Sequence, residues 1–145
     1  MAKATYPYVA IALPANQAYP EGTTAFRPLT FATLRAANGQ SIRCMVLPDS
    51  GADACLFPLS LAILLRLDVL NLPKALTGGV GSQANVTYYD TITIDLGNGI
   101  QFDAYVGFTQ GMDPIGFGLL GQAGFFEKHR VEFQHTNRIF TIEPA

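Results

Sequence analysis

Apolar and polar residues alternate along much of this chain, which is the pattern of β-strands that bury one face. Two alternating runs, residues 29–36 and 41–47, are separated by the dipeptide Asn38-Gly39, which adopts positive φ readily and favours a hairpin turn. A longer strand-like region covers residues 76–108 and contains a glycine-rich turn at residues 97–99. The pattern therefore predicts one short hairpin and at least one long one.

Two segments depart from this alternation. Residues 58–70 (PLSLAILLRLDVL) are rich in leucine and fit a short helix that Asn71 and Pro73 end. Residues 118–133 (GLLGQAGFFEKHRVEF) predict a strand, a sharp glycine turn and a short helix, and a last strand follows at residues 138–142. The sequence thus indicates an all-β domain with one or two short helices, compatible with a small closed β-barrel.

The first 28 residues contain prolines at positions 7, 14, 20 and 28, which exclude a long helix. This stretch predicts an arm of short extended pieces that wraps around or pairs with the main body. No repeat, low-complexity tract or linker interrupts the rest of the sequence. We therefore expect an arm over residues 1–28 and a single domain over residues 29–145.

The composition limits the partners. Apolar residues make up 49% of the 145 residues and charged residues only 14%, which favours a globular protein that self-associates through an apolar surface. The net charge is −2 and the basic residues form no run, so neither nucleic acid nor an anionic membrane is an expected partner. We find neither the roughly 18 to 20 consecutive apolar residues of a membrane span nor the layout of a secretory signal. We expect a soluble protein, either cytoplasmic or a domain of a longer one.

The cysteines and histidines do not indicate a metal site. Cys44 and Cys55 lie near an apparent strand and a tight turn, without the four-ligand company that zinc requires. We expect both to be ordinary buried residues. His129 and His135 lie in a charged late segment and are expected at the surface. The sequence therefore implies no metal and no cofactor.

The segment VLPDSGADACLFP, residues 46–58, places two aspartates between apolar runs. Asp49 follows a predicted strand, Gly51 permits a tight turn, and Ser50 can hydrogen-bond the carboxylate or the backbone beside it. Strand ends followed by loops are where catalytic groups are often found. An Asp-Ser-Gly triplet alone is also common as a plain turn, so both interpretations stand at this point.

Together with two later segments, this turn resembles the retropepsin-like aspartic proteases, the single-domain family that includes the retroviral proteases. The three features occur in the family's order: DSGAD at residues 49–53, GGVGS at residues 78–82 and GLLGQAGFF at residues 118–126. In that family the second segment carries the flap, and the third is an apolar-apolar-Gly strand followed by a short helix. The resemblance extends over residues 29–142.

The resemblance implies a closed β-barrel that contributes one catalytic aspartate, Asp49, to a two-fold dimer. The family's chemistry needs two aspartates that share a proton and activate a water. Because the chain has a single Asp-Ser-Gly turn, the second aspartate would come from another copy, which implies a homodimer. The implied activity is hydrolysis of peptide or protein substrates without a cofactor.

The resemblance also assigns supporting roles. Ser50, Gly51 and Ala52 would build the active-site turn, and Asp53 would receive backbone amides of the bound peptide. Three residues would form the flap tip that closes over an extended substrate: Gly79, Val80 and Gly81. Three others would pack against the catalytic turn: Leu119, Leu120 and Gly121.

Two positions differ from the retroviral pattern. Pro48 stands where that family has a residue with an amide to donate, and Gln122 replaces an arginine that pairs with the second acidic residue. A retropepsin-like module without protease activity, serving for peptide binding or dimerisation, is therefore a second hypothesis. A plain β-barrel interaction module, in which the Asp49 turn is only structural, is a third.

Overall fold

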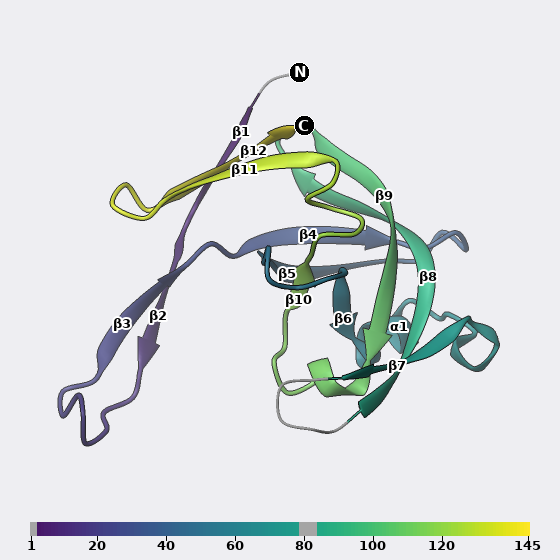
Figure 1. The fold of residues 1–145 in the computed structure, drawn as a ribbon, viewed down its shortest axis with the longest axis horizontal. Coiled ribbons are helices and arrows are strands. Elements are labelled where there is room, and N and C mark those ends of the chain that lie inside the picture. Colours follow the sequence, from purple (N-terminus) through teal and green to yellow (C-terminus); the bar gives the residue numbers. More distant parts are fainter. Residues whose placement is uncertain (1–2, 79–83) are drawn as a thin grey trace.

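The computed structural model describes residues 3–78 and 84–145, and within them six strands close into a barrel. The barrel strands are β4 (Thr30–Arg35), β5 (Ser41–Pro48), β6 (Leu56–Pro58), β8 (Ala84–Gly97), β9 (Ile100–Thr109) and β10 (Gly118–Leu120). They are hydrogen-bonded in the order β4-β5-β10-β6-β9-β8, and a β4–β8 pairing closes the circle (Figure 1). The predicted all-β barrel is confirmed.

Both predicted hairpins are present. β4 pairs antiparallel with β5, and the turn between them has Gly39 at φ 87°. β8 pairs antiparallel with β9 through a turn in which Asn98 has φ 53° and its two flanking glycines are also at positive φ. Such backbone angles favour glycine and asparagine, which explains why the Asn-Gly and Gly-Asn-Gly sequences mark the turns. β7 (Lys74–Gly78) extends this hairpin by pairing with β8 outside the closed barrel.

The predicted helix over residues 58–70 is shorter in the structure. α1 covers Leu59–Leu64 and is followed by the short 3-10 helix η1 (Val69–Asn71). No side chain caps the start of α1, and Arg66 adopts φ 58°, a left-handed conformation that ends the helix. A second 3-10 turn, η2 (Gln110–Met112), lies between β9 and β10.

The prediction of a helix after β10 was wrong. Residues 121–128 form a series of turns, in which the Phe126 N–H donates to the Gly121 carbonyl at 3.1 Å instead of to the residue four positions back. Gly124 adopts φ 97°, which an α-helix does not contain. Its N–H donates to the Glu127 carboxylate at 2.9 Å, so this turn satisfies the backbone in a non-helical way.

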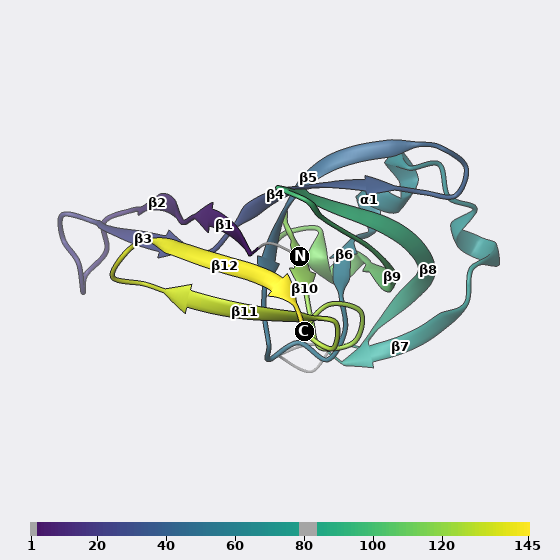
Figure 2. The same ribbon diagram turned by 90° about the horizontal axis from the view of Figure 1, so that it is seen from above.

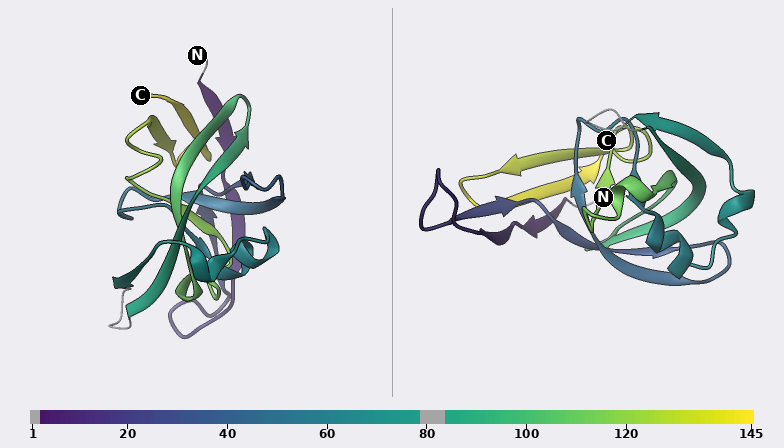
Figure 3. Two further views of the ribbon diagram at one scale, coloured as in Figure 1. Left: turned by 90° about the vertical axis from the view of Figure 1, so that its right-hand side faces the viewer. Right: turned by 90° about the horizontal axis from the view of Figure 1, so that it is seen from below.

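The N-terminal residues form strands of their own. β1 (Ala4–Pro7) pairs with β12 (Ile139–Pro144), which also pairs with β11 (His129–Gln134), and the three make a separate sheet. β2 (Val9–Leu13) and β3 (Thr23–Arg27) form a two-stranded hairpin that projects from the barrel (Figures 1, 2 and 3). The expected pairing of the arm with the body is therefore present at β1, while a domain boundary at residue 28 stays a prediction.

The core fills the barrel and continues under the three-stranded sheet. Its largest fully buried side chains are Phe57, Phe108, Phe125, Phe140, Leu34, Leu65, Ile92, Ile94, Leu120 and Ile142. Tyr6 from β1 is 3% exposed and stacks on Phe140 with 5.2 Å between ring centroids, so the first strand shares this core. Within the described residues, no helix is long and apolar enough to cross a membrane.

His129 is buried, which corrects the expectation of a surface position. Its ring packs against both Phe102 and Phe125, with centroid distances of 4.7 and 4.9 Å, and Nδ1 is 3.0 Å from the Phe125 carbonyl oxygen. Burial lowers the pKa of His129. The charged neighbours in the sequence point outward from β11, whereas His129 begins that strand on its inner side. His135 is exposed, as expected.

Candidate active site

Strands β5 and β10 run parallel and bring the Asp49 turn beside the Leu-Leu-Gly segment. Leu47 is in register with Leu119 and Pro48 with Leu120, although the segments are far apart in the chain. The Asp49 N–H continues this ladder by donating to the Leu120 carbonyl oxygen at 2.9 Å. The structure therefore brings together two of the three segments that the sequence had singled out.

Pro48 fits this arrangement without leaving a ladder bond unmade. The N–H that faces β10 is that of Asp49, and alternation directs the nitrogen of residue 48 to the opposite side. On that side β5 pairs with β4, and this pairing ends at Val46 opposite Thr30. The donor that proline lacks is thus not required here, as is usual for proline at the end of a strand ladder.

The Asp49 turn is closed by its own carboxylate. The Gly51 N–H donates to Asp49 Oδ1 at 3.0 Å, and the Ala52 N–H donates to the Asp49 carbonyl at 3.1 Å. A Cβ on Gly51 would lie 3.2 Å from Asp49 Oδ1, a tight approach that glycine avoids. Asp49 is partly exposed, while Ser50 and Gly51 are exposed. The turn therefore presents a fixed carboxylate next to an open backbone surface.

Gly121 lies directly beneath this turn. A Cβ there would be 2.7 Å from the Ala52 carbonyl oxygen and would collide with the carbonyl group of Ala54. Its N–H donates to the buried sulfur of Cys55 at 3.4 Å. Burial raises the pKa of Cys55 to about 11, so this thiol stays protonated. Close packing on backbone explains why glycine is needed at this position.

Asp53 is exposed and, within the described residues, forms no ion pair. Its backbone carbonyl accepts the Ala123 N–H at 2.9 Å, which adds one bond to the parallel contact between residues 54 and 123. Among the hydrogen bonds of the described residues, none joins the Gln122 side chain to the Asp53 carboxylate. Its side-chain amide instead donates to the Ser50 carbonyl oxygen at 2.9 Å.

Three apolar side chains form a row next to Asp49, and the sequence had indicated only one of them, Leu119. The row consists of Leu47 in β5, Leu119 in β10 and Leu56 in β6, which are in register and all partly exposed. Residues in register share one face of a sheet, and Asp49 follows Leu47 by two positions, which directs it to that face. Leu120, one position along, points to the core and is fully buried. In the sequence, only the alternation of apolar and polar residues indicates these positions. The order of the strands in the barrel is needed to see that the three leucines are neighbours.

The row ends at Gly107 in β9, which is in register with Leu56. A Cβ on Gly107 would lie 2.9 Å from Leu56 Cδ2 and 2.5 Å from Thr87 Cγ2. These two side chains therefore close over the glycine and fix the position of Leu56. Further along, Leu76 of β7 and Val86 of β8 form an exposed cross-strand pair. The predicted flap tip, Gly79, Val80 and Gly81, lies outside the described residues.

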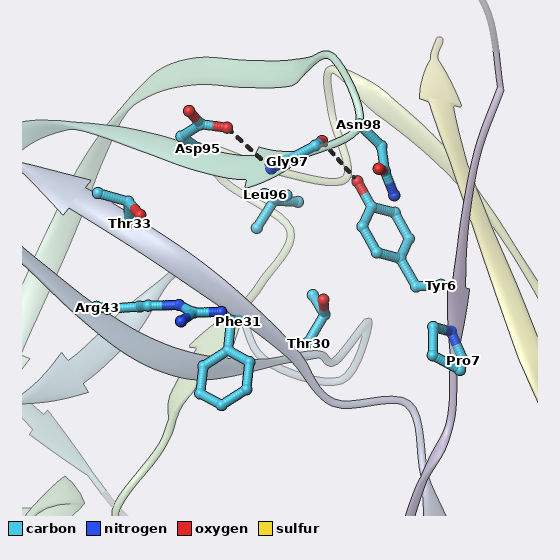
Figure 4. Close-up of a pocket in the computed structure, with 10 residues that line it drawn as sticks. All are labelled: Tyr6, Pro7, Thr30, Phe31, Thr33, Arg43, Asp95, Leu96, Gly97 and Asn98. Atoms are coloured by element: carbon cyan, nitrogen blue, oxygen red, sulfur yellow. Dashed lines mark hydrogen bonds between the residues drawn. The ribbon is translucent and has the colours of Figure 1, made fainter.

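A separate hollow of about 380 Å³ lies between β1, β4 and the β8–β9 turn, away from the Asp49 turn (Figure 4). It is lined by Tyr6, Pro7, Thr30, Phe31, Thr33, Arg43, Asp95, Leu96, Gly97 and Asn98. The Tyr6 hydroxyl donates to the Gly97 carbonyl at 3.1 Å, and Asp95 Oδ1 accepts the Gly97 N–H at 2.8 Å. Burial, with the nearby Asp95 charge, raises the pKa of Tyr6 to about 12. The bond from Tyr6 to Gly97 attaches the first strand to the barrel.

Comparison with known proteins supports the architecture. No family model and no curated protein matches this sequence. Among solved structures, the chain is similar to a retropepsin-like aspartic protease from Rickettsia conorii, with a TM-score of 0.53 and 17% sequence identity. The similarity covers 92% of this chain and 98% of the Rickettsia chain, so it extends over the barrel and nearly all of both chains. The protein therefore has the retropepsin-like fold.

Proposed function

We propose that this protein is a homodimeric aspartic endopeptidase whose catalytic pair is Asp49 from each of two copies. The observation that carries the proposal is the Asp49-Ser50-Gly51 turn at the ends of the parallel strands β5 and β10, in a chain with a retropepsin-like fold. One chain offers one such turn, so the second carboxylate comes from a symmetry-related copy. The exposed outer side of Ser50 and Gly51 is available to that copy.

The chemistry follows from two facing carboxylates. At a separation of about 3 Å they cannot both ionise, so the pair holds one proton. The ionised Asp49 removes a proton from a water, whose oxygen attacks the peptide carbonyl carbon, while the protonated Asp49 donates to the carbonyl oxygen. Collapse of the tetrahedral intermediate breaks the C–N bond, and the departing nitrogen receives a proton from the pair.

The substrate is an extended peptide with apolar side chains near the bond that is cut. Leu47, Leu56 and Leu119 would form the apolar wall of the cleft beside Asp49. The exposed Asp53 carboxylate would accept backbone amides of the peptide. An extended chain bound in this way adds a strand to existing sheet edges, which recognises backbone more than sequence.

The test is the variant Asp49→Asn, assayed with an unstructured protein such as casein, with cleavage followed by mass spectrometry between pH 4 and 7. We expect cleavage to fall by about a thousandfold or more, because an amide cannot serve as the base. Asp95→Asn is a matched control, since Asp95 Oδ1 also accepts the N–H two residues on and lies away from the turn. Circular dichroism checks that both variants fold.

Two results would contradict the proposal. One is unchanged cleavage in Asp49→Asn. The other is cleavage by wild-type protein that analytical ultracentrifugation shows to be monomeric at the assay concentration. Binding of a statine-type transition-state mimic without cleavage at any pH would instead favour the inactive peptide-binding module.

A further inference from the structure

Gln122 binds the Asp49 turn through both its backbone and its side chain. The Gln122 backbone N–H donates to the Ala52 carbonyl oxygen at 2.9 Å, and the side-chain Nε2 donates to the Ser50 carbonyl oxygen at 2.9 Å. The residues joined by the side-chain bond are 72 positions apart in the sequence. Gln122 thus ties the turn to the segment that follows β10.

The Ser50 carbonyl belongs to the same peptide unit as the Gly51 N–H, which donates to Asp49 Oδ1 at 3.0 Å. A peptide unit is planar and rigid, so holding its carbonyl end fixes the direction of its N–H end. Gln122 is therefore connected to the Asp49 carboxylate through one rigid unit and two hydrogen bonds. In such a chain each hydrogen bond polarises the next and strengthens it.

We propose that Gln122 is a positioning residue, whose side-chain amide holds the Ser50–Gly51 peptide unit so that its N–H points at the Asp49 carboxylate. This inference rests on the proposed function, in which Asp49 must stay aligned with its counterpart. Gly51 has no Cβ, so the peptide unit before it rotates readily once its carbonyl is released. Rotation withdraws the N–H from Asp49 and leaves that side chain free to leave its productive rotamer.

The test compares Gln122→Met, which keeps the length of the side chain without its donor, with Gln122→Glu, which keeps the shape of the side chain and whose carboxylate also lacks a donor. We expect kcat in Gln122→Met to fall about three- to tenfold with KM unchanged, the loss corresponding to one hydrogen bond. The exchange rate of the Gly51 amide with water, measured by NMR, should rise by a similar factor. The Gly51 exchange rate should also rise in Gln122→Glu.

Gln134→Met is the matched control, because Gln134 Nε2 donates to Glu132 Oε1 at 2.9 Å on β11, remote from the turn. The inference is overturned if Gln122→Met has wild-type Gly51 exchange, or if Gln134→Met has the same effects. If the wild-type protein cleaves nothing, the proposed function fails, yet Gly51 exchange still decides the role of Gln122. If Gln122→Met does not fold, Gln122→Glu decides: fast Gly51 exchange supports the role, and wild-type exchange refutes it.

Discussion

Replacing Gly121 by alanine tests whether the Asp49 turn depends on close backbone packing. The new Cβ would lie 2.7 Å from the Ala52 carbonyl oxygen and would collide with the carbonyl group of Ala54. Both neighbours are backbone, so the collision can be relieved only by moving the two segments apart. Separation would stretch two hydrogen bonds between them, Gln122 N–H to Ala52 and Ala123 N–H to Asp53, both 2.9 Å long.

The magnitude follows from these two effects. Overpacking a close-packed site destabilises a protein by about 1–3 kcal/mol, and weakening each hydrogen bond adds about 1 kcal/mol. We expect Gly121→Ala to lower the free energy of unfolding by about 3–5 kcal/mol. For a chain of this size that corresponds to a fall in Tm of roughly 10–15 °C. Urea denaturation and thermal melting, both followed by circular dichroism, measure these quantities.

Gly111→Ala is the control for this prediction. A Cβ on Gly111 would lie 2.7 Å from Nδ2 of Asn85, so it would meet side-chain atoms and no backbone atom. We expect it to lower the free energy of unfolding by less than Gly121→Ala does, because a side-chain atom yields more easily than backbone. The reasoning is refuted if Gly121→Ala is as stable as the wild type, or if both variants are destabilised equally.

Two further predictions concern Pro48 and His129. Pro48→Ala should keep peptide cleavage and lower the free energy of unfolding by about 2–3 kcal/mol in urea denaturation, because the chain loses rigidity and the buried ring loses two methylenes, while no ladder bond changes. Abolished cleavage or unchanged stability would contradict this. The pKa of His129 is lowered in the folded protein, so on acidification the unfolded chain binds a proton at this site before the folded protein does. The free energy of unfolding is therefore highest above the ordinary histidine pKa and falls as the pH drops below about 6.5. His129→Gln should flatten this fall between pH 6.5 and 5 in urea titrations, and an unchanged slope would show that His129 does not cause it.

The sequence predicted the hairpin turns and the Asp49 turn, because their conformations depend on residues that are adjacent in the chain. The turns at residues 38–39 and 97–99 need positive φ, and the residues there are the ones that adopt it. The Asp49 turn could also be recognised, because its hydrogen bonds to Gly51 and Ala52 form within four residues. The prediction that this turn packs against Leu119–Gly121 came from the family resemblance. The periodicity of apolar residues alone does not predict it.

The rest depended on contacts between distant segments. The helix expected after β10 failed because Gly124 takes a left-handed φ, which the apolar and charged pattern of that segment does not reveal. His129 was expected outside because its neighbours are charged, although its partner Phe102 is on another strand. Leu56 was missed because its position beside Asp49 depends on the order of β6 and β10 in the barrel. Strand order is a tertiary property that a single sequence specifies only weakly.

The bond between Gln122 and Ser50 also bears on when the site can form during synthesis. The 72 residues from Gly51 to Gln122 are added at about 5–20 residues per second, so the turn exists for roughly 4 to 14 s before its supporting segment has been made. During that interval the carboxylate has only its local bond to Gly51. In the proposed dimer, an ordered pair of Asp49 residues would require chains translated past β10, so unfinished chains on the ribosome would not cut their neighbours.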